Sequence, residues 1–258
     1  MGRTDNAAFS KLWNKVPEVT IFFWIIKILA TTVGETAGDL LSVRLGLGLT
    51  VTSWVMSAVC IVALIAQVRT KRYYPTPYWL EVVLISVVGT LISDLLVDGL
   101  HISLVITTIA FSTILAAVFG AWYASERTLS IHTIFTTRRE LFYWAAILFT
   151  FALGTAAGDL IAEHLNLGYW KSALLFAGSI GLVALAHFKF GMNAILSFWL
   201  AYILTRPLGA SIGDYLSQAR ADGGLGLGTV GTSAIFLATI LGVVTYLAKT
   251  KKDQPALG

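Results

Sequence analysis

Charged side chains are scarce in this chain, and their scarcity decides its class. Asp, Glu, Lys and Arg make up 12% of its 258 residues, about half the share of a typical soluble domain. Hydrophobic residues make up 57%, and the mean hydropathy is +0.78. So few charges cannot cover a soluble surface, which excludes an ordinary soluble domain and indicates an integral membrane protein.

Cysteine is nearly absent as well. Cys60 is the only one, so an intrachain disulfide and a site of several thiolates are both excluded. The chain also lacks a pair of His residues at metal-ligand spacing on a helix, a nucleophile elbow, and a His near Cys60 in the sequence. We therefore expect no enzymatic activity and no resident cofactor, a transported cation aside.

Long apolar runs take up most of the chain instead. A helix needs about 20 residues to cross the roughly 30 Å hydrocarbon core of a bilayer. Eight runs have about this length: 19–43, 50–68, 79–98, 102–123, 141–162, 170–187, 192–216 and 228–247. They predict an all-α polytopic membrane protein with eight transmembrane helices. No small-residue cleavage site follows the polar start, so we expect the first run to remain as a helix.

Basic residues fall mainly on one side of this predicted topology. Of the 18 Lys and Arg residues, thirteen lie on the side of the two termini: Arg3, Lys11, Lys15, Arg69, Lys71, Arg72, Arg127, Arg138, Arg139, Lys189, Lys249, Lys251 and Lys252. The positive-inside rule then places both termini in the cytoplasm. The net charge of +4 thus reflects topology, and no loop is long enough to offer a nucleic-acid-binding surface.

One segment of the sequence occurs four times. GETAGD at 34–39 returns as GTLISD at 89–94, GTAAGD at 154–159 and GASIGD at 209–214, displaced by 55, 65 and 55 residues. A Trp stands ten residues before each opening Gly: Trp24, Trp79, Trp144 and Trp199. Each copy lies in a helix that a second helix follows, so the repeating unit is a two-helix hairpin. Two helices per unit make the four units parallel.

The spacing inside the repeat places its Asp at membrane depth. With the Trp in the cytoplasmic aromatic belt, the helix carries the Asp roughly 22 Å further, into the outer part of the membrane. Small residues four apart, such as Gly34 and Gly38, allow close helix contact. We expect the four motif helices to pack tightly with their carboxylates at one level: Asp39, Asp94, Asp159 and Asp214.

The four motifs with their upstream Trp residues resemble a family of bacterial membrane-anchored proteins built from tandem copies of a short repeat of unknown function. The resemblance covers about residues 17 to 248. It implies the fold and a bacterial cytoplasmic (inner) membrane, but no activity. The predicted organisation is an N-terminal segment (1–18), two repeats (19–123), a cytoplasmic linker (124–140), two further repeats (141–248) and a cytoplasmic tail (249–258).

Carboxylates at membrane depth are candidate ion ligands. A charge there costs about 2.5–3.5 kcal/mol on insertion scales and so faces a partner or a wet cavity. Four at one level repel one another, which favours a bound cation that exchanges with protons. Thr90 and Thr155 would complete an oxygen-rich shell suited to Mg²⁺, Mn²⁺ or Ca²⁺, and sodium or protons would also fit.

Three charges break the fourfold pattern. Glu35 shares a helix face with Asp39, Arg206 precedes Pro207 in the fourth repeat, and Lys27 lies in the first. The equivalent positions of the other repeats are uncharged. This asymmetry favours a single off-axis site with Glu35 and Arg206, in which Arg206 is a counterion or contacts an anionic group of a substrate. Lys27 alternatively extends to the cytoplasmic interface.

The remaining polar residues favour plainer roles. Glu81 stands at a membrane edge, where we expect a solvated or interfacial charge. His101 near Asp98 and His164 beside Glu163 lack a third ligand. Surface polar residues are therefore favoured over metal sites at both histidines.

These patterns favour a transporter or channel for a small cation, a divalent metal above others, with proton coupling as an option. The alternatives are a transporter of a small organic solute, and a membrane scaffold in which each motif Asp accepts a hydrogen bond from a neighbouring helix or pairs with Arg206. The partners expected are the lipid bilayer and the transported cation or solute, with no nucleic acid.

Overall fold

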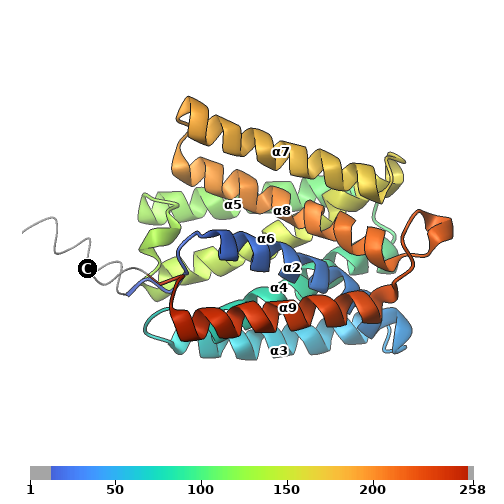
Figure 1. The fold of residues 1–258 in the computed structure, drawn as a ribbon, viewed down its shortest axis with the longest axis horizontal. Helices are drawn as coiled ribbons and strands as arrows, with labels where there is room; N and C mark the ends of the chain where they lie inside the picture. The colour runs from blue at the N-terminus through green and yellow to red at the C-terminus, as the bar shows by residue number, and fades with distance from the viewer. Residues whose placement is uncertain (1–12, 255–258) are drawn as a thin grey trace, which may run out of the picture.

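Eight long helices make up most of the chain in the computed structural model, which describes residues 13–254. They are α2 (Ile21–Asp39), α3 (Leu49–Arg69), α4 (Pro75–Asp94), α5 (Leu104–Glu126), α6 (Thr137–Asp159), α7 (Tyr169–Phe190), α8 (Ala194–Ser217) and α9 (Gly228–Thr250). They run side by side along the long axis of the molecule (Figure 1). Each is long and apolar enough to cross a membrane, which confirms the predicted fold class of a multi-pass membrane protein.

Four of these helices form an inner ring. α2 packs on α4, α4 on α6, α6 on α8, and α8 returns to α2. The buried share of these four spans is 56–61%, against 6–28% for α3, α5, α7 and α9. The helices that carry the Gly-to-Asp motifs therefore form the core, as their small residues predict, and the other four cover it.

Each outer helix packs mainly against the inner helix of the next repeat. α3 lies on α4, α5 on α6, α7 on α8, and α9 closes the circle on α2. The hairpin predicted from the sequence is therefore wrong as a packing unit. After each inner helix the chain crosses to the neighbouring inner helix and packs its outer helix there. Each inner helix is therefore covered by the outer helix of the repeat before it.

A wide turn begins directly after the motif Asp in three of the repeats. These turns are π-helical: η1 (Leu40–Arg44), η2 (Leu95–Gly99) and η4 (Leu160–His164). In the fourth repeat α8 instead continues as an α-helix to Ser217. Single π-helical turns occur frequently at functional sites, and here they mark the level of the motif carboxylates.

The motif glycines let the inner helices approach closely. The residue three positions before each motif Gly lies against the Gly of the preceding repeat: Ser86 on Gly34, Phe151 on Gly89, Arg206 on Gly154 and Thr31 on Gly209. A Cβ at Gly89 would lie 2.6 Å from Cβ of Phe151 and 3.1 Å from the backbone nitrogen of Ala152. Any side chain at this position would therefore have to push α6 away from α4.

Gly89→Ala should accordingly destabilise the ring. We expect the free energy of unfolding in detergent to fall by about 1–3 kcal/mol, the usual cost of overpacking a core, measured by chemical denaturation with tryptophan fluorescence. Gly120→Ala in α5 is the matched control, because nothing lies within 4 Å of a Cβ there and Ala forms helix better than Gly. Equal losses in the two variants would contradict the packing argument.

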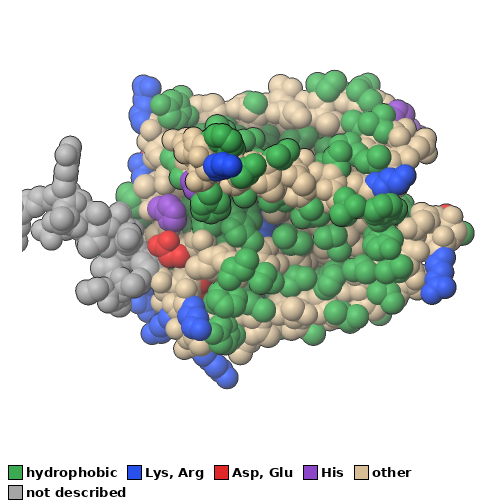
Figure 2. Space-filling view, turned by 45° about the horizontal axis from the view of Figure 1, so that its top comes forward, with side chains coloured by type: hydrophobic (Ala, Val, Ile, Leu, Met, Phe, Trp, Pro, Cys, Tyr) green, Lys and Arg blue, Asp and Glu red, His purple; other side chains and the backbone are tan. Residues whose placement is uncertain are grey.

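The end of the bundle at which the described chain begins and ends is here called the basic end. The described Lys and Arg residues that lie there are Lys15, Arg69, Lys71, Arg72, Arg127, Arg138, Arg139, Lys189, Lys249, Lys251 and Lys252. Arg3 and Lys11, which the sequence places on the same side, lie outside the described residues. Figure 2 shows blue Lys and Arg side chains gathered at the two ends of the molecule and green hydrophobic ones between them. This banding suits a protein that spans a bilayer.

Buried polar contacts close the basic end. Nζ of Lys15 lies 2.6 Å from Oε2 of Glu140, and both side chains are buried. The backbone N–H of Lys15 donates to the carbonyl of Ile134 at 2.9 Å. The hydroxyls of Tyr78 and Tyr143 hydrogen bond to each other at the same end of α4 and α6. The chain segment before α2 is thereby held against the end of α3 and the start of α6.

Candidate functional site

Arg206 lies inside the inner ring. Its side chain is fully buried, with 0% of its surface exposed, and it comes from α8, which passes through Pro207 as one continuous helix. Gly154 on α6 leaves the space for it, because a Cβ at that Gly would lie 2.2 Å from Cγ of Arg206. The close packing of motif glycines thus also creates the place for a buried cation.

The guanidinium of Arg206 reaches all three other inner helices. It donates to the hydroxyl of Thr155 at 2.6 Å and to the hydroxyl of Thr90. It also donates to the backbone carbonyl of Thr31 at 3.2 Å and to that of Phe151 at 3.3 Å. Since these partners lie on α2, α4 and α6, one side chain cross-links the whole ring.

Glu35 supplies the counterion of Arg206. Its Oε2 lies 3.0 Å from Nη2 of Arg206, and its side chain is 10% exposed. The two groups are paired by distance but lack the alignment of a hydrogen bond, so Coulomb attraction in a site with little water holds them together. Glu35, Thr90 and Thr155 occupy one equivalent position, directly after the motif Gly. Three repeats therefore each contribute the side chain at this position to the contacts of one guanidinium.

Lys27 is a second buried cation, closer to the basic end. It is 0% exposed, and its Nζ lies 4.0 Å from the ring centroid of Phe151 and 4.3 Å from that of Tyr202. It also donates to the hydroxyl of Thr31 at 3.3 Å. The alternative in which Lys27 extends to the interface is wrong, because two aromatic faces and a hydroxyl stabilise its ammonium inside the ring.

The motif aspartates lie beyond this centre, toward the end opposite the basic end. Asp39, Asp94 and Asp159 are half-buried, and Asp214 is 8% exposed. Asp94 lies near enough to interact electrostatically with Glu35, Asp39 and Asp159. The carboxylates of three repeats thus form a connected acidic level next to the pair of Glu35 and Arg206.

The carboxylates of this acidic level do not form a preformed site of three or more metal ligands among the described residues. Among the side chains that the structure describes, no three from Asp, Glu, His and Cys are placed to hold a metal ion together. Each motif Asp lies four residues beyond the position that faces Arg206, so it keeps nearly the same helix face but lies about 6 Å further along the axis. The shared metal site expected from Asp39, Asp94, Asp159 and Asp214 stays a prediction.

Glu81 is buried, contrary to the expectation of a solvated or interfacial charge. It is 0% exposed, and Sγ of Cys60 donates to its Oε1 at 3.4 Å. The expectation is wrong because α3, which belongs to the preceding repeat, covers this face of α4. The hydropathy of α4 alone does not predict that α3 buries this face of the helix.

The comparisons with known proteins agree with the fourfold architecture. The family model described as Repeat of Unknown Function (DUF347) matches the chain four times, over residues 22–73, 77–128, 142–192 and 197–253. Each match contains one inner helix and the outer helix that follows it. No curated protein and no solved structure matches the chain. The chain therefore belongs to the DUF347 repeat family, and its four motifs with their upstream Trp residues are one per repeat.

Proposed function

We propose that this protein is a proton-coupled carrier of a small cation, in which Arg206 and the transported ion compete for Glu35. The observation that carries the proposal is the ion pair of Glu35 and Arg206, 3.0 Å long and buried, one helical turn from a level of half-buried carboxylates. Ionisable groups at this depth mark ion and proton pathways by default. Here the pair also joins four helices, so breaking it would affect the whole ring.

In this proposal the guanidinium of Arg206 neutralises Glu35 when no ion is bound. A cation held by Asp39 lies one turn, roughly 6 Å along the helix, from Glu35 and weakens the attraction of its carboxylate for the guanidinium. Protonation of Glu35 has the same effect, because a neutral carboxyl no longer pairs with Arg206. Cation binding at Asp39 and protonation of Glu35 thus both weaken the ion pair of Glu35 and Arg206, which would couple the two events.

Repulsion within the acidic level favours the uptake of positive charge. Asp94 interacts with the charges of Glu35, Asp39 and Asp159, and like charges repel strongly where the dielectric constant is low. Because no three carboxylates within the described part of the chain share a ligand shell, the ion would take one or two of them, with hydroxyl and backbone oxygens completing its coordination. Hard cations prefer such oxygen ligands, so we propose an inorganic cation, with Na⁺ and divalent metals both candidates.

We place the basic end in the cytoplasm of a bacterial inner membrane, following the positive-inside rule. The closed layer of Lys15 and Glu140 then faces inward and the carboxylates face outward. We propose that the ion enters from the outer side, where Asp39, Asp94 and Asp159 are only half-buried.

Ion flux into liposomes that contain the purified protein tests the proposal. The panel is Na⁺, K⁺, Mg²⁺, Ca²⁺ and Mn²⁺, each with and without an imposed proton gradient. We expect flux of at least one cation that responds to the gradient, and a loss of about tenfold or more in Asp39→Asn and Glu35→Gln, the scale of a single lost charge interaction. Asp222→Asn in the exposed loop before α9 is the matched control and should transport like the wild type.

Two outcomes would end the cation proposal. One is the absence of flux for every ion with a folded protein, which would move the assignment to an organic solute or to a scaffold. The other is full activity in both Asp39→Asn and Glu35→Gln. A shared loss in all three variants, Asp222→Asn included, would point to damaged folding, which size-exclusion chromatography of each variant checks.

A further inference from the structure

A pocket of about 530 Å³ lies near the basic end, away from the buried charges. The start of α2, the end of α7, the start of α8 and linker residues 129–132 form its walls. Its volume is within the range of about 300–1,000 Å³ typical of ligand sites. Hydrophobic side chains make most of the lining, and the polar groups are Ser130, His132, His187 and Ser197.

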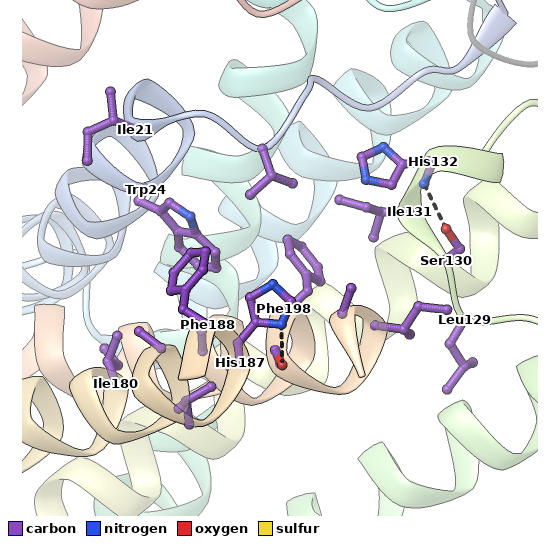
Figure 3. A pocket seen from close by; sticks show the side chains of 17 residues that line it. Ile21, Trp24, Leu129, Ser130, Ile131, His132, Ile180, His187, Phe188 and Phe198 are labelled. Atoms are coloured by element: carbon purple, nitrogen blue, oxygen red, sulfur yellow. Dashed lines mark hydrogen bonds between the residues drawn. The ribbon is translucent and has the colours of Figure 1, made fainter. Parts of the chain in front are cut away.

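Two of the polar groups lie at one side of this pocket and His187 lies in its middle, while the far side is apolar (Figure 3). Figure 3 shows His132 and Ser130 at one side, His187 in the middle, and Ile21 and Ile180 toward the other side. An occupant with one polar and one apolar end matches this division. A hydrophilic solute would leave most of the lining unpaired, and a purely apolar one would leave the histidines without a partner.

His187 directs one ring nitrogen into the pocket. Its Nδ1 lies 2.9 Å from the carbonyl oxygen of Met192 and 3.3 Å from the hydroxyl of Ser197. A carbonyl only accepts, so Nδ1 carries the proton. The other nitrogen, Nε2, then faces the cavity (Figure 3), where it is fixed in place to meet a ligand.

The apolar side of the pocket faces the hydrocarbon region. Phe188 and Ile21 at its edge are 85% and 67% exposed, and in a bilayer such large exposed apolar side chains would lie against lipid. His132 at the polar side is half exposed and lies beyond the helix ends, with its Nδ1 3.8 Å from Oε2 of Glu18. The pocket therefore runs from the level of lipid head groups into the level of their chains.

We propose that this pocket binds a phospholipid with a zwitterionic ammonium head group, with one acyl chain between α2, α7 and α8. Binding of the phosphate would place a second proton on His187, whose Nε2 would then donate to a phosphate oxygen together with a ring N–H of His132, and the ammonium would lie against the carboxylate of Glu18 beside His132. The carboxylate of Glu18 beside His132 attracts an ammonium and repels a second negative group, which suits a zwitterion better than an anionic lipid. The pocket wall includes Phe198, whose ring packs on that of Tyr202 at 5.5 Å, so the lipid would contact the layer that covers Lys27.

Native mass spectrometry of the full chain in detergent tests the assignment, titrated separately with phosphatidylethanolamine and phosphatidylglycerol. The wild type should retain one phosphatidylethanolamine and bind it at least tenfold more tightly than phosphatidylglycerol. Ala201→Phe and Ala184→Phe, which fill the pocket, should each weaken that binding at least tenfold. Ala177→Phe on the exposed face of α7 is the matched control and should bind normally. Glu18→Gln should reduce the preference between the two lipids to less than threefold.

Several results would overturn the proposal. Retention of the lipid in both filled variants, with thermal unfolding unchanged, would place it elsewhere on the surface. Equal or tighter binding of phosphatidylglycerol by the wild type would contradict the head-group assignment. A loss of binding in Ala177→Phe as large as in Ala201→Phe would show that the effect does not depend on this pocket.

Discussion

Arg206→Met should lower the free energy of unfolding by about 3–5 kcal/mol, the usual cost of removing one partner from a buried ion pair. The substitution leaves Glu35 in the ring without its counterion. It also removes the donor to the hydroxyls of Thr90 and Thr155. The measurement is chemical denaturation in detergent micelles, followed by tryptophan fluorescence.

Arg206→Met with Glu35→Gln separates the effect of charge from that of packing. Because Gln needs no counterion, we expect the double variant to regain at least half of the lost stability. Arg220→Met is the matched control: this Arg lies on the surface and donates only to the carbonyl of Leu225 at 3.5 Å, so its stability should stay within about 0.5 kcal/mol of the wild type. If Arg206→Met were as stable as Arg220→Met, Arg206 would not be the cross-link that its contacts indicate.

The sequence predicts this fold well because its signals are local. Each transmembrane helix is visible in the sequence as an apolar run long enough to cross a bilayer. Each motif Gly indicates a helix face that another helix can approach closely. The spacing of Trp and Asp also fixes a level along the axis, so it correctly places Asp94 near Asp39 and Asp159. These properties depend on residues within one helix, which a single chain displays directly.

The site is harder to predict because its contacts join different repeats. The level of an Asp follows from its spacing to the Trp, but whether the four carboxylates converge on one ion depends on side chains from separate helices, so the metal site stays a prediction. The burial of Glu81 and Lys27 likewise depends on side chains from neighbouring repeats. A usable signal did exist for Lys27: Tyr202, one of the two aromatic residues that it contacts, occupies the equivalent position of the fourth repeat. The other, Phe151, lies one turn further along its helix, at the position of Arg206 in the third repeat. In a closed ring, equivalent positions meet.

A disulfide between α6 and α8 should stop transport, if the protein is a carrier. A Cβ at Gly158 would lie 3.9 Å from Cβ of Ala210, close to the mean of about 3.8 Å in disulfides. Ala210 is equivalent to Glu35, so the bond would fix two inner helices at the level of the ion pair. The background is Cys60→Ser, because Cys60 is the only native cysteine and a hydroxyl can still donate to Glu81.

The expected result is a complete and reversible loss of ion flux in Gly158→Cys with Ala210→Cys. Oxidised liposomes should show no flux above protein-free liposomes, and a reducing agent should restore it, whereas each single cysteine variant should transport in both conditions. The reason is that release of Arg206 from Glu35 requires α8 to move relative to the helices it cross-links. Unchanged flux in the fully oxidised protein would mean that α6 and α8 stay fixed while the ion passes. That outcome would contradict a carrier and favour a channel through a rigid ring.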